Sequence, residues 1–179
     1  MDQETPKASE PEEDYPPVIE RELIPAPREM SSQASEFLRD GRSRFKQVSC
    51  FDFVPSNYEN AWNLLNGLER GSFCEWGCGL GIVVGLAEFL GFNASGIELD
   101  PELAEAARSL LRDHNLNAQI TTGSYFDSNE ACDYHYVYTW PGQIPYVEKH
   151  FSDIATSRSQ LLICYGQDFL KCMVPRKTS

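Results

Sequence analysis

The sequence predicts an α/β fold, in which a mostly parallel sheet of five or six strands lies between two layers of helices. From residue 72 onward, short apolar segments of strand length alternate with longer segments whose apolar residues recur at helical spacing. The breaks between them fall at turn and capping residues such as Gly91 and the pair Asp100 and Pro101. Strands joined by helical crossovers form right-handed units, and such units place parallel strands side by side.

The elements follow one another in a regular order. We expect strands at 72–76, 93–98, 118–122, 133–139 and 160–165, and helices at 81–90, 101–115 and 146–155. An earlier helix is expected to begin at Ser56, because Ser56 and Glu59 have the spacing of a capping box. Residues 32–47 predict a short polar helix that is interrupted at Gly41. This order implies a Rossmann-like three-layer sandwich.

The chain divides into an arm and one domain. Residues 1–35 form an acidic N-terminal arm that we expect to be disordered or loosely docked, with Val18 and Ile19 as a docking patch, and residues 36–179 form the domain. Residues 1–30 carry nine acids and three bases, and residues 31–179 carry 18 acids and 12 bases, so each part has a net charge of −6. Because nucleic-acid affinity depends on cations that neutralise phosphates, this balance argues against direct nucleic-acid binding.

The composition limits the compartment and the metal content. No apolar run approaches the ~20 residues of a membrane span, and the N-terminus has no basic and apolar leader, so we predict a cytoplasmic protein. The six cysteines show no paired spacing typical of metal ligands, and several lie in expected strands. We therefore expect reduced structural thiols and no metal site.

The turn after the first expected strand is the most informative segment. Gly77, Gly79 and Gly81 alternate there, which lets the backbone turn tightly and approach a ligand at the start of a helix. A dinucleotide-binding turn requires a glycine where this chain has Ile82, counting from Gly77. The phosphate loop of ATPases requires a Gly-Lys pair that is absent. Both nucleotide signatures are excluded.

The segment resembles the first motif of class I S-adenosylmethionine-dependent methyltransferases, in which an acid precedes a G-x-G-x-G turn by two residues. Here the acid is Glu75, and the resemblance covers about residues 54–165. The second strand ends at Glu98, similar to the family's acid that binds both ribose hydroxyls, and Glu98 follows Gly77 by 21 positions. The segment Phe53-Val54-Pro55-Ser56 looks like the F-x-P-[ST] stretch that some members place over the methionine end of the cofactor.

The resemblance implies the cofactor S-adenosyl-L-methionine and a set of binding residues. Leu99 is expected beside the adenine, and Ser124 stands where the family often has an aspartate that contacts the adenine amino group. The residues implied to bind the cofactor are Pro55, Ser56, Glu75, Gly77, Cys78, Gly79, Gly81, Glu98, Leu99, Ser124, Tyr125 and Thr139.

The loop after the fourth expected strand should face the methyl acceptor. Its sequence, Thr139-Trp140-Pro141-Gly142, departs from the pattern of enzymes that methylate base amines. The catalytic candidates are Trp140, Thr139 and Tyr125. Trp140 is favoured, together with the nearby Tyr138, because an aromatic face attracts a sulfonium or ammonium cation. Methyl transfer by in-line displacement needs alignment more than a base, for which Asp127, Asp133 and Tyr125 are the nearest candidates. His135 is expected to be packed, and His114 and His150 to lie away from the site.

Two functional classes remain. The first is a methyltransferase that acts on a protein side chain, lysine included, or on a small molecule, and the alternative is a noncatalytic S-adenosylmethionine-binding or interaction module with the same fold. The family usually completes its sheet with a hairpin, whereas residues 167–179 can supply one short strand at most. The sheet edge should then be covered by the arm, a partner or a second copy in a homodimer.

Overall fold

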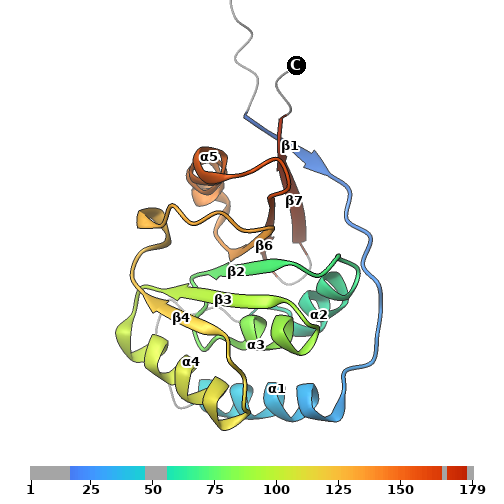
Figure 1. Cartoon of the computed structure of the whole chain (residues 1–179), viewed down its shortest axis with the longest axis vertical. Helices are drawn as coiled ribbons and strands as arrows, with labels where there is room; N and C mark the ends of the chain where they lie inside the picture. Colours follow the sequence, from blue (N-terminus) through green and yellow to red (C-terminus); the bar gives the residue numbers. More distant parts are fainter. Residues whose placement is uncertain (1–16, 47–55, 167–168, 177–179) are drawn as a thin grey trace, which may run out of the picture.

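The computed structural model describes residues 17–46, 56–166 and 169–176, and it contains one seven-stranded sheet (Figure 1). The strands are β1 (Val18–Arg21), β2 (Ser72–Trp76), β3 (Asn93–Glu98), β4 (Gln119–Thr122), β5 (Tyr134–Tyr138), β6 (Gln160–Tyr165) and β7 (Phe169–Pro175). The helices are α1 (Ser32–Phe45), α2 (Tyr58–Asn66), α3 (Ile82–Phe89), α4 (Pro101–Asp113) and α5 (Ile144–Ile154), with short 3₁₀ turns η1 (Tyr125–Asp127) and η2 (Pro141–Gln143).

The five strands expected from the sequence are confirmed, three of them with the same ends and two within one residue. In the order β4-β3-β2-β5-β6 they pair in parallel throughout. The predicted fold class, a Rossmann-like sandwich with a mostly parallel sheet, is therefore confirmed. Among the described residues, no helix has the length and apolar character that crossing a bilayer requires.

The strand count exceeds the expected five or six. After β6 the chain forms β7, a seven-residue strand antiparallel to β6, and β1 then pairs antiparallel with β7. The last strand thus comes from the N-terminal arm, with Ile19 opposite Val174. Its single buried residue is Val18, which packs with Met173 on the α5 side of the sheet. A four-residue strand with one buried side chain leaves almost no periodic signal in the sequence.

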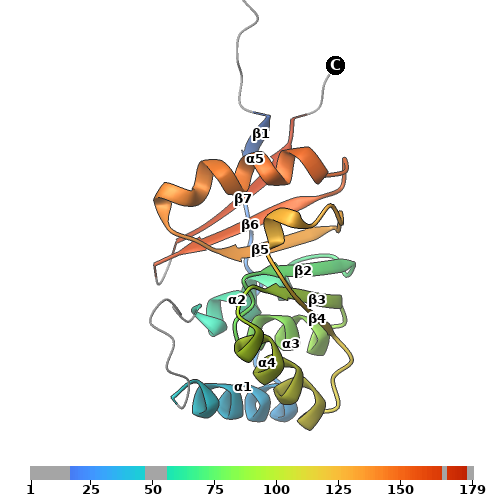
Figure 2. The ribbon, with the colours of Figure 1, turned by 90° about the vertical axis from the view of Figure 1, so that its left-hand side faces the viewer.

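Helices cover both faces of the sheet, as Figure 2 shows. The larger core lies between the sheet and α1 to α4, and the smaller core lies under α5. In the crossover from β4 to β5 the only helical segment is η1, so a hollow of about 530 Å³ remains on the α5 side, lined by β2, β3, β4 and this crossover.

Helix α1 runs unbroken through Gly41, so the expected interruption there is wrong. The helix lies outside α3 and α4 (Figure 1), and an ideal Cβ at Gly41 would lie 2.8 Å from side-chain carbons of Ile82 and 3.2 Å from Leu110. The glycine therefore allows close helix packing and does not break the helix.

The start of α2 also differs by one residue from the expectation. Asn57, and not Ser56, caps the helix, because its side chain accepts a hydrogen bond of 3.1 Å from the N–H of Asn60. At α4 the expected cap is confirmed, since Asp100 accepts from the N–H groups of Glu102 and Leu103.

The segment between β1 and α1 is fastened to α2. The N–H of Ala26 donates to the carbonyl of Asn63 at 2.9 Å, and Asn66 Nδ2 donates to the carbonyl of Ala26 at 2.9 Å. The carbonyl of Arg28 accepts a hydrogen bond of 2.9 Å from the indole of Trp62. The described part of the arm therefore holds both the sheet edge and α2.

Substituting Gly85 should test the packing of α1 on α3. A Cβ at Gly85 would overlap the fully buried ring of Phe37. We expect Gly85→Ala to lower the free energy of unfolding by ~1–3 kcal/mol through overpacking, although alanine is the better helix former by ~1 kcal/mol. Gly142→Ala is the matched control, since its Cβ would meet nothing within 4 Å. Denaturant unfolding that shows equal stability for both variants would contradict this packing.

Candidate functional site

The candidate site lies where the carboxyl ends of the parallel strands meet. In the register, Glu98 pairs with Thr122 and Trp76 lies between Ile97 and Val137, so the ends of β2, β3, β4 and β5 lie at one edge. The chain builds β3 and β4 on one side of β2 and then returns with β5 on the other side. Ligands bind at such a reversal of strand order in open α/β sheets.

The glycine turn after β2 contains three residues with positive φ. Gly77, Gly79 and Gly81 have φ values of 71°, 53° and 68°, which L-residues with side chains rarely adopt. A Cβ on Gly77 would meet nothing within 4 Å, so space is open beside this residue. A Cβ on Gly81 would instead lie 3.2 Å from the Cβ of Ala107 in α4. Gly77 thus borders the open space, and Gly81 serves close packing between the turn and α4.

Glu98 connects two turns of the site. It is 8% exposed, and its Oε2 accepts a hydrogen bond of 2.7 Å from the N–H of Gly79. Its Oε1 accepts a hydrogen bond of 2.9 Å from the N–H of Asp100 at the start of α4. One carboxylate therefore holds the turn after β2 against the turn after β3.

Glu75 is a second buried acid at the same edge. It is 5% exposed, and its Oε2 accepts a hydrogen bond of 3.2 Å from the N–H of Val84 in α3. Burial raises the pKa of Glu75 well above its usual range, the hydrogen bond opposes this shift, and the charge of Glu98 adds to it. Burial, and then the charge of Glu75, likewise raise the pKa of Tyr58, which places the start of α2 near this acid.

Ser56 lies near the end of β5. Its side chain hydrogen-bonds the hydroxyl of Tyr136, which is buried and also donates to Cys164 Sγ at 3.2 Å. The start of α2 thus lies beside β5, and Pro55, the other residue expected to contact the cofactor here, lies outside the described residues.

Cys78 and Leu99 have opposite surroundings. The thiol of Cys78 is buried beneath Gly96, where an ideal Cβ would lie 2.8 Å from the sulfur, so only the backbone of Cys78 can face a ligand. Leu99 follows Glu98 and is 70% exposed, which leaves an apolar side chain accessible at the strand end.

The loop after β4 brings Ser124 and Tyr125 to the same edge. Ser124 Oγ caps η1 by accepting from the N–H of Phe126 at 3.2 Å. The ring of Tyr125 stacks on Trp76 with 5.2 Å between centroids, and burial raises its pKa. His150 lies 5.1 Å from the Trp76 ring and 6.4 Å from the Tyr125 ring, so the expectation that it lies away from the site is wrong. The periodicity of α5 could have placed His150 on its inner face.

The loop after β5 carries the other catalytic candidates. Thr139 is buried, its N–H donates to the Cys164 carbonyl, and its hydroxyl donates to Gln143 Oε1 at 2.9 Å. Trp140 is 55% exposed and contacts Tyr138 edge to face, with 6.3 Å between ring centroids. Of this pair, Trp140 presents the accessible surface.

One suggested base lies at the wrong end of the sheet. Asp133 precedes β5, where it accepts hydrogen bonds from Ser72 and pairs with Arg158. These contacts hold its pKa below the usual range. Asp133 is therefore a structural residue at the amino ends of the strands, and Asp127, in η1, remains the nearer carboxyl.

Comparison with solved structures shows that this fold is that of S-adenosylmethionine-dependent methyltransferases. An RNA methyltransferase from Salinibacter ruber, in complex with S-adenosyl-L-homocysteine, superposes with a TM-score of 0.61 and 16% identity, over 70% of this chain and 97% of that one. An O-methyltransferase from Bacillus cereus, also in complex with this product, gives a TM-score of 0.59 at 17% identity over 75% of this chain and 66% of that one.

A Podospora anserina methyltransferase bound to the same product has a TM-score of 0.59 and 15% identity, and the match covers 75% of this chain but only 62% of that one. Several of the similar proteins are thus longer than the part this chain matches. No protein-family model matches the sequence, and the sequence of no curated protein matches it either.

A buried histidine makes the stability of the domain depend on pH. His135 is fully buried, its Nε2 accepts from the N–H of Cys132, and its Nδ1 has no partner among the described residues. Burial, and then the proximity of His150, lower the pKa of His135 from its usual 6.5 to about 4. Because the folded state resists protonation, its stability is intact above pH 6.5 and falls as the pH drops toward 4.

We expect the free energy of unfolding to fall in this window by up to ~1.4 kcal/mol per pH unit. His135→Gln should flatten this slope in denaturant titrations, whereas His114→Gln, which leaves His135 in place, should retain it. An unchanged slope in the His135 variant would assign the pH dependence to other groups.

Proposed function

We propose that this chain is an S-adenosylmethionine-dependent methyltransferase whose acceptor is a protein side chain, such as lysine, or a small molecule. The observation that carries the proposal is the carboxylate of Glu98, held at the tip of β3 between two backbone N–H groups and next to the open space at Gly77. The likeness to the methyltransferases bound to S-adenosyl-L-homocysteine supports the choice of cofactor.

The hydrogen-bonding capacity of Glu98 fits a ribose. An ionised carboxylate offers about four acceptor sites. The N–H groups of Gly79 and Asp100 occupy one site on each oxygen. One site on each oxygen remains, which suits the two neighbouring hydroxyls of a ribose.

Glu75 and the turn suit the amino acid end of the cofactor. A buried carboxyl whose pKa is raised lacks a cation that would favour its charged form. The ammonium of a bound methionine moiety would provide that charge beside the open backbone at Gly77. Leu99, exposed directly after Glu98, offers an apolar surface to an adenine, and the turn at Ser124 and Tyr125 closes the other side.

The bound cofactor would supply a methyl group on a good leaving group, so the protein's main task is to align the acceptor. Trp140 is the exposed aromatic residue at the end of β5 and would contact the acceptor. Thr139 is held by Gln143 and would position this loop. Tyr125 is stacked on Trp76, and burial raises its pKa, so a packing role fits it better than that of a base.

Replacing Glu98 tests the cofactor site directly. We expect Glu98→Gln to weaken S-adenosylmethionine binding about 10- to 150-fold, because charge-assisted hydrogen bonds to the ribose are lost. Calorimetric titration measures this effect, with Glu102→Gln in the first turn of α4 as the control. A wild-type protein that gives neither heat nor a thermal shift with the cofactor or its product would refute the proposal.

The same two variants decide whether the protein is an enzyme. Incubation of a cell lysate with methyl-labelled cofactor should yield a labelled product with the wild type and with Glu102→Gln, and little with Glu98→Gln. Cofactor binding without any labelled product would favour a noncatalytic binding module.

Cofactor affinity should also depend on the charge of Glu75. Below its raised pKa the free protein holds Glu75 protonated, whereas a bound ammonium favours the carboxylate, so binding releases a proton. Affinity should therefore fall by up to about tenfold per unit as the pH is lowered below this pKa. Glu75→Gln should bind more weakly and lose this dependence, and calorimetry in buffers of different ionisation heat would detect the proton. A Glu75→Gln variant with the wild-type pH dependence would contradict this role.

A further inference from the structure

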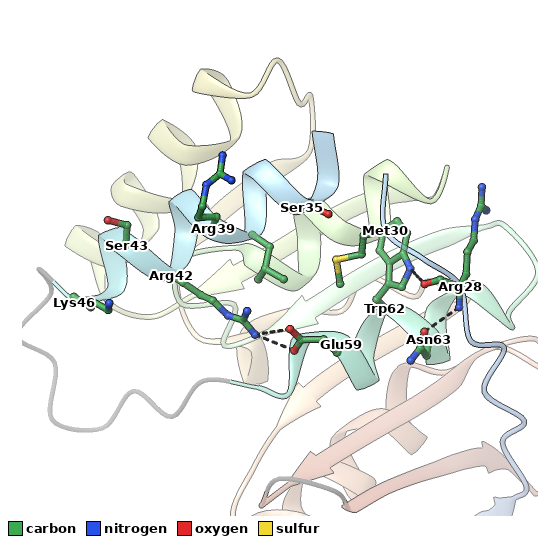
Figure 3. A pocket seen from close by; sticks show the side chains of 11 residues that line it. Arg28, Met30, Ser35, Arg39, Arg42, Ser43, Lys46, Glu59, Trp62 and Asn63 are labelled. Carbon is green, nitrogen blue, oxygen red and sulfur yellow. Dashed lines mark hydrogen bonds and ion pairs between the residues drawn. The ribbon is translucent and has the colours of Figure 1, made fainter. Parts of the chain in front are cut away.

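The groove of greatest interest outside the cofactor site lies between α1 and α2. It has a volume of about 710 Å³, and the segment around Arg28 and Met30 closes one end (Figure 3). Small-molecule sites have volumes of about 300–1,000 Å³, so this groove has the size of a small ligand. None of the described residues of the proposed cofactor site lines it.

The charge of the groove is opposite to that of the chain. Among the described residues, the ionisable side chains that line it are Arg28, Arg39, Arg42, Lys46 and one acid, Glu59, which gives four positive charges and one negative charge, or +3. The whole chain carries −12. Cations gathered in a concave surface attract anions more strongly than the same cations spread over a surface.

Two acids of the neighbouring surface are bound to a cation outside the groove. Asp40 of α1 accepts hydrogen bonds from Arg44 at 2.8 Å and 3.2 Å, which lower its pKa, and it also contacts His114. Asp113 of α4 also binds Arg44, at 2.7 Å. The carboxylates at this helix junction are thus bound to Arg44, which does not line the groove.

Arg42 is held in place for a ligand. Its Nη2 donates to both oxygens of Glu59, at 2.8 Å and 2.9 Å, and its guanidinium lies 5.6 Å from the centre of the Tyr58 ring. Both of these hydrogen bonds use Nη2, so neither of them occupies Nη1 or Nε. Arg39 is 78% exposed, and its nearest acid, Glu36, lies 3.9 Å away, which is a weak contact.

The groove leads toward the proposed site of methyl transfer. A second hollow of about 270 Å³ shares Arg42 and Lys46 with the groove and adds Ser56 and Tyr58. The Ser56 side chain hydrogen-bonds Tyr136 of β5, and the charge of Glu75 contributes to the raised pKa of Tyr58. The second hollow therefore connects the groove to Ser56, a residue of the proposed cofactor site.

We propose that the methyl acceptor is a small molecule with an anionic group, phosphate or carboxylate, that binds in the groove between α1 and α2. This inference rests on the proposed methyltransferase function and narrows its acceptor. A small molecule fits better than RNA, because the aromatic ring among the described lining residues, Trp62, is buried and its N–H donates to the carbonyl of Arg28. It offers no face for stacking a base.

The test measures anion binding separately from cofactor binding. The full chain is titrated with inorganic phosphate, and in a second arm with citrate, at constant ionic strength, and binding is followed by NMR. The groove variant is Arg39→Gln with Lys46→Gln, two exposed side chains. The matched control, Arg112→Gln with Lys149→Gln, removes two charges that are similarly exposed and lie outside the groove. Calorimetry with S-adenosylmethionine is run on all three proteins.

We expect saturable binding of one of the two anions, weakened about tenfold or more in the groove variant and unchanged in the control. The anion that binds more tightly, phosphate or citrate, identifies the anionic group of the methyl acceptor. If neither anion binds, the proposal is overturned. If both variants lose binding equally, binding is a general charge effect and the proposal is also overturned. If a mixed single-stranded RNA binds more tightly and with the same variant dependence, the acceptor is not a small molecule. If S-adenosylmethionine gives no heat of binding with any of the three proteins, the proposed methyltransferase function is refuted instead.

Discussion

The carboxylate of Glu98 is the contact on which the geometry of the site depends. It accepts the N–H of Gly79 with one oxygen and the N–H of Asp100 with the other, so two turns that begin at neighbouring strands cannot move independently. Burying an acid whose oxygens have no hydrogen-bond donor costs free energy of folding. Here two backbone N–H groups donate to the carboxylate, and each oxygen keeps further acceptor capacity. The same contact that completes the fold therefore prepares the strand ends for a ligand.

A second constraint is the completion of the sheet. Beyond β6 the C-terminal segment supplies β7, and the N-terminal arm supplies the outer strand β1, so strands from opposite ends of the chain replace the hairpin that the resemblance implies. The arm then continues along α2, where Ala26 and Arg28 bind Asn63, Asn66 and Trp62. Because α2 begins at the proposed cofactor site and lines the groove, the arm has a part in positioning both.

The sequence predicts the parallel core and the glycine turn well, because both depend on local patterns. Strands β2 to β6 are short segments that alternate with segments of helical periodicity and end at turn or capping residues, and the spacing from Gly77 to Glu98 reflects one helix and one strand. The failures concern features set by contacts distant in the chain. Gly41 was expected to interrupt a helix, but it allows Ile82 and Leu110 to pack closely against α1. Asp133 was a candidate base, but its carboxylate is bound by Ser72 and Arg158. The short β1 has a single buried residue and required β7 to form.

Net charge illustrates the same limit for function. A total of −12 argues against anionic ligands only if the acids are spread evenly over the surface. In the folded protein Arg44 binds the carboxylates of Asp40 and Asp113. The cations at Arg39, Arg42 and Lys46 follow one another along α1 and its C-cap, and Glu59 is the one acid among the described residues that line the groove. Helical periodicity places residues three and seven apart on the same side of a helix, so the spacing was present in the sequence. Whether these cations form a positive surface depends on which acids are already paired with Arg44. The packing of α1 against α4 determines that pairing.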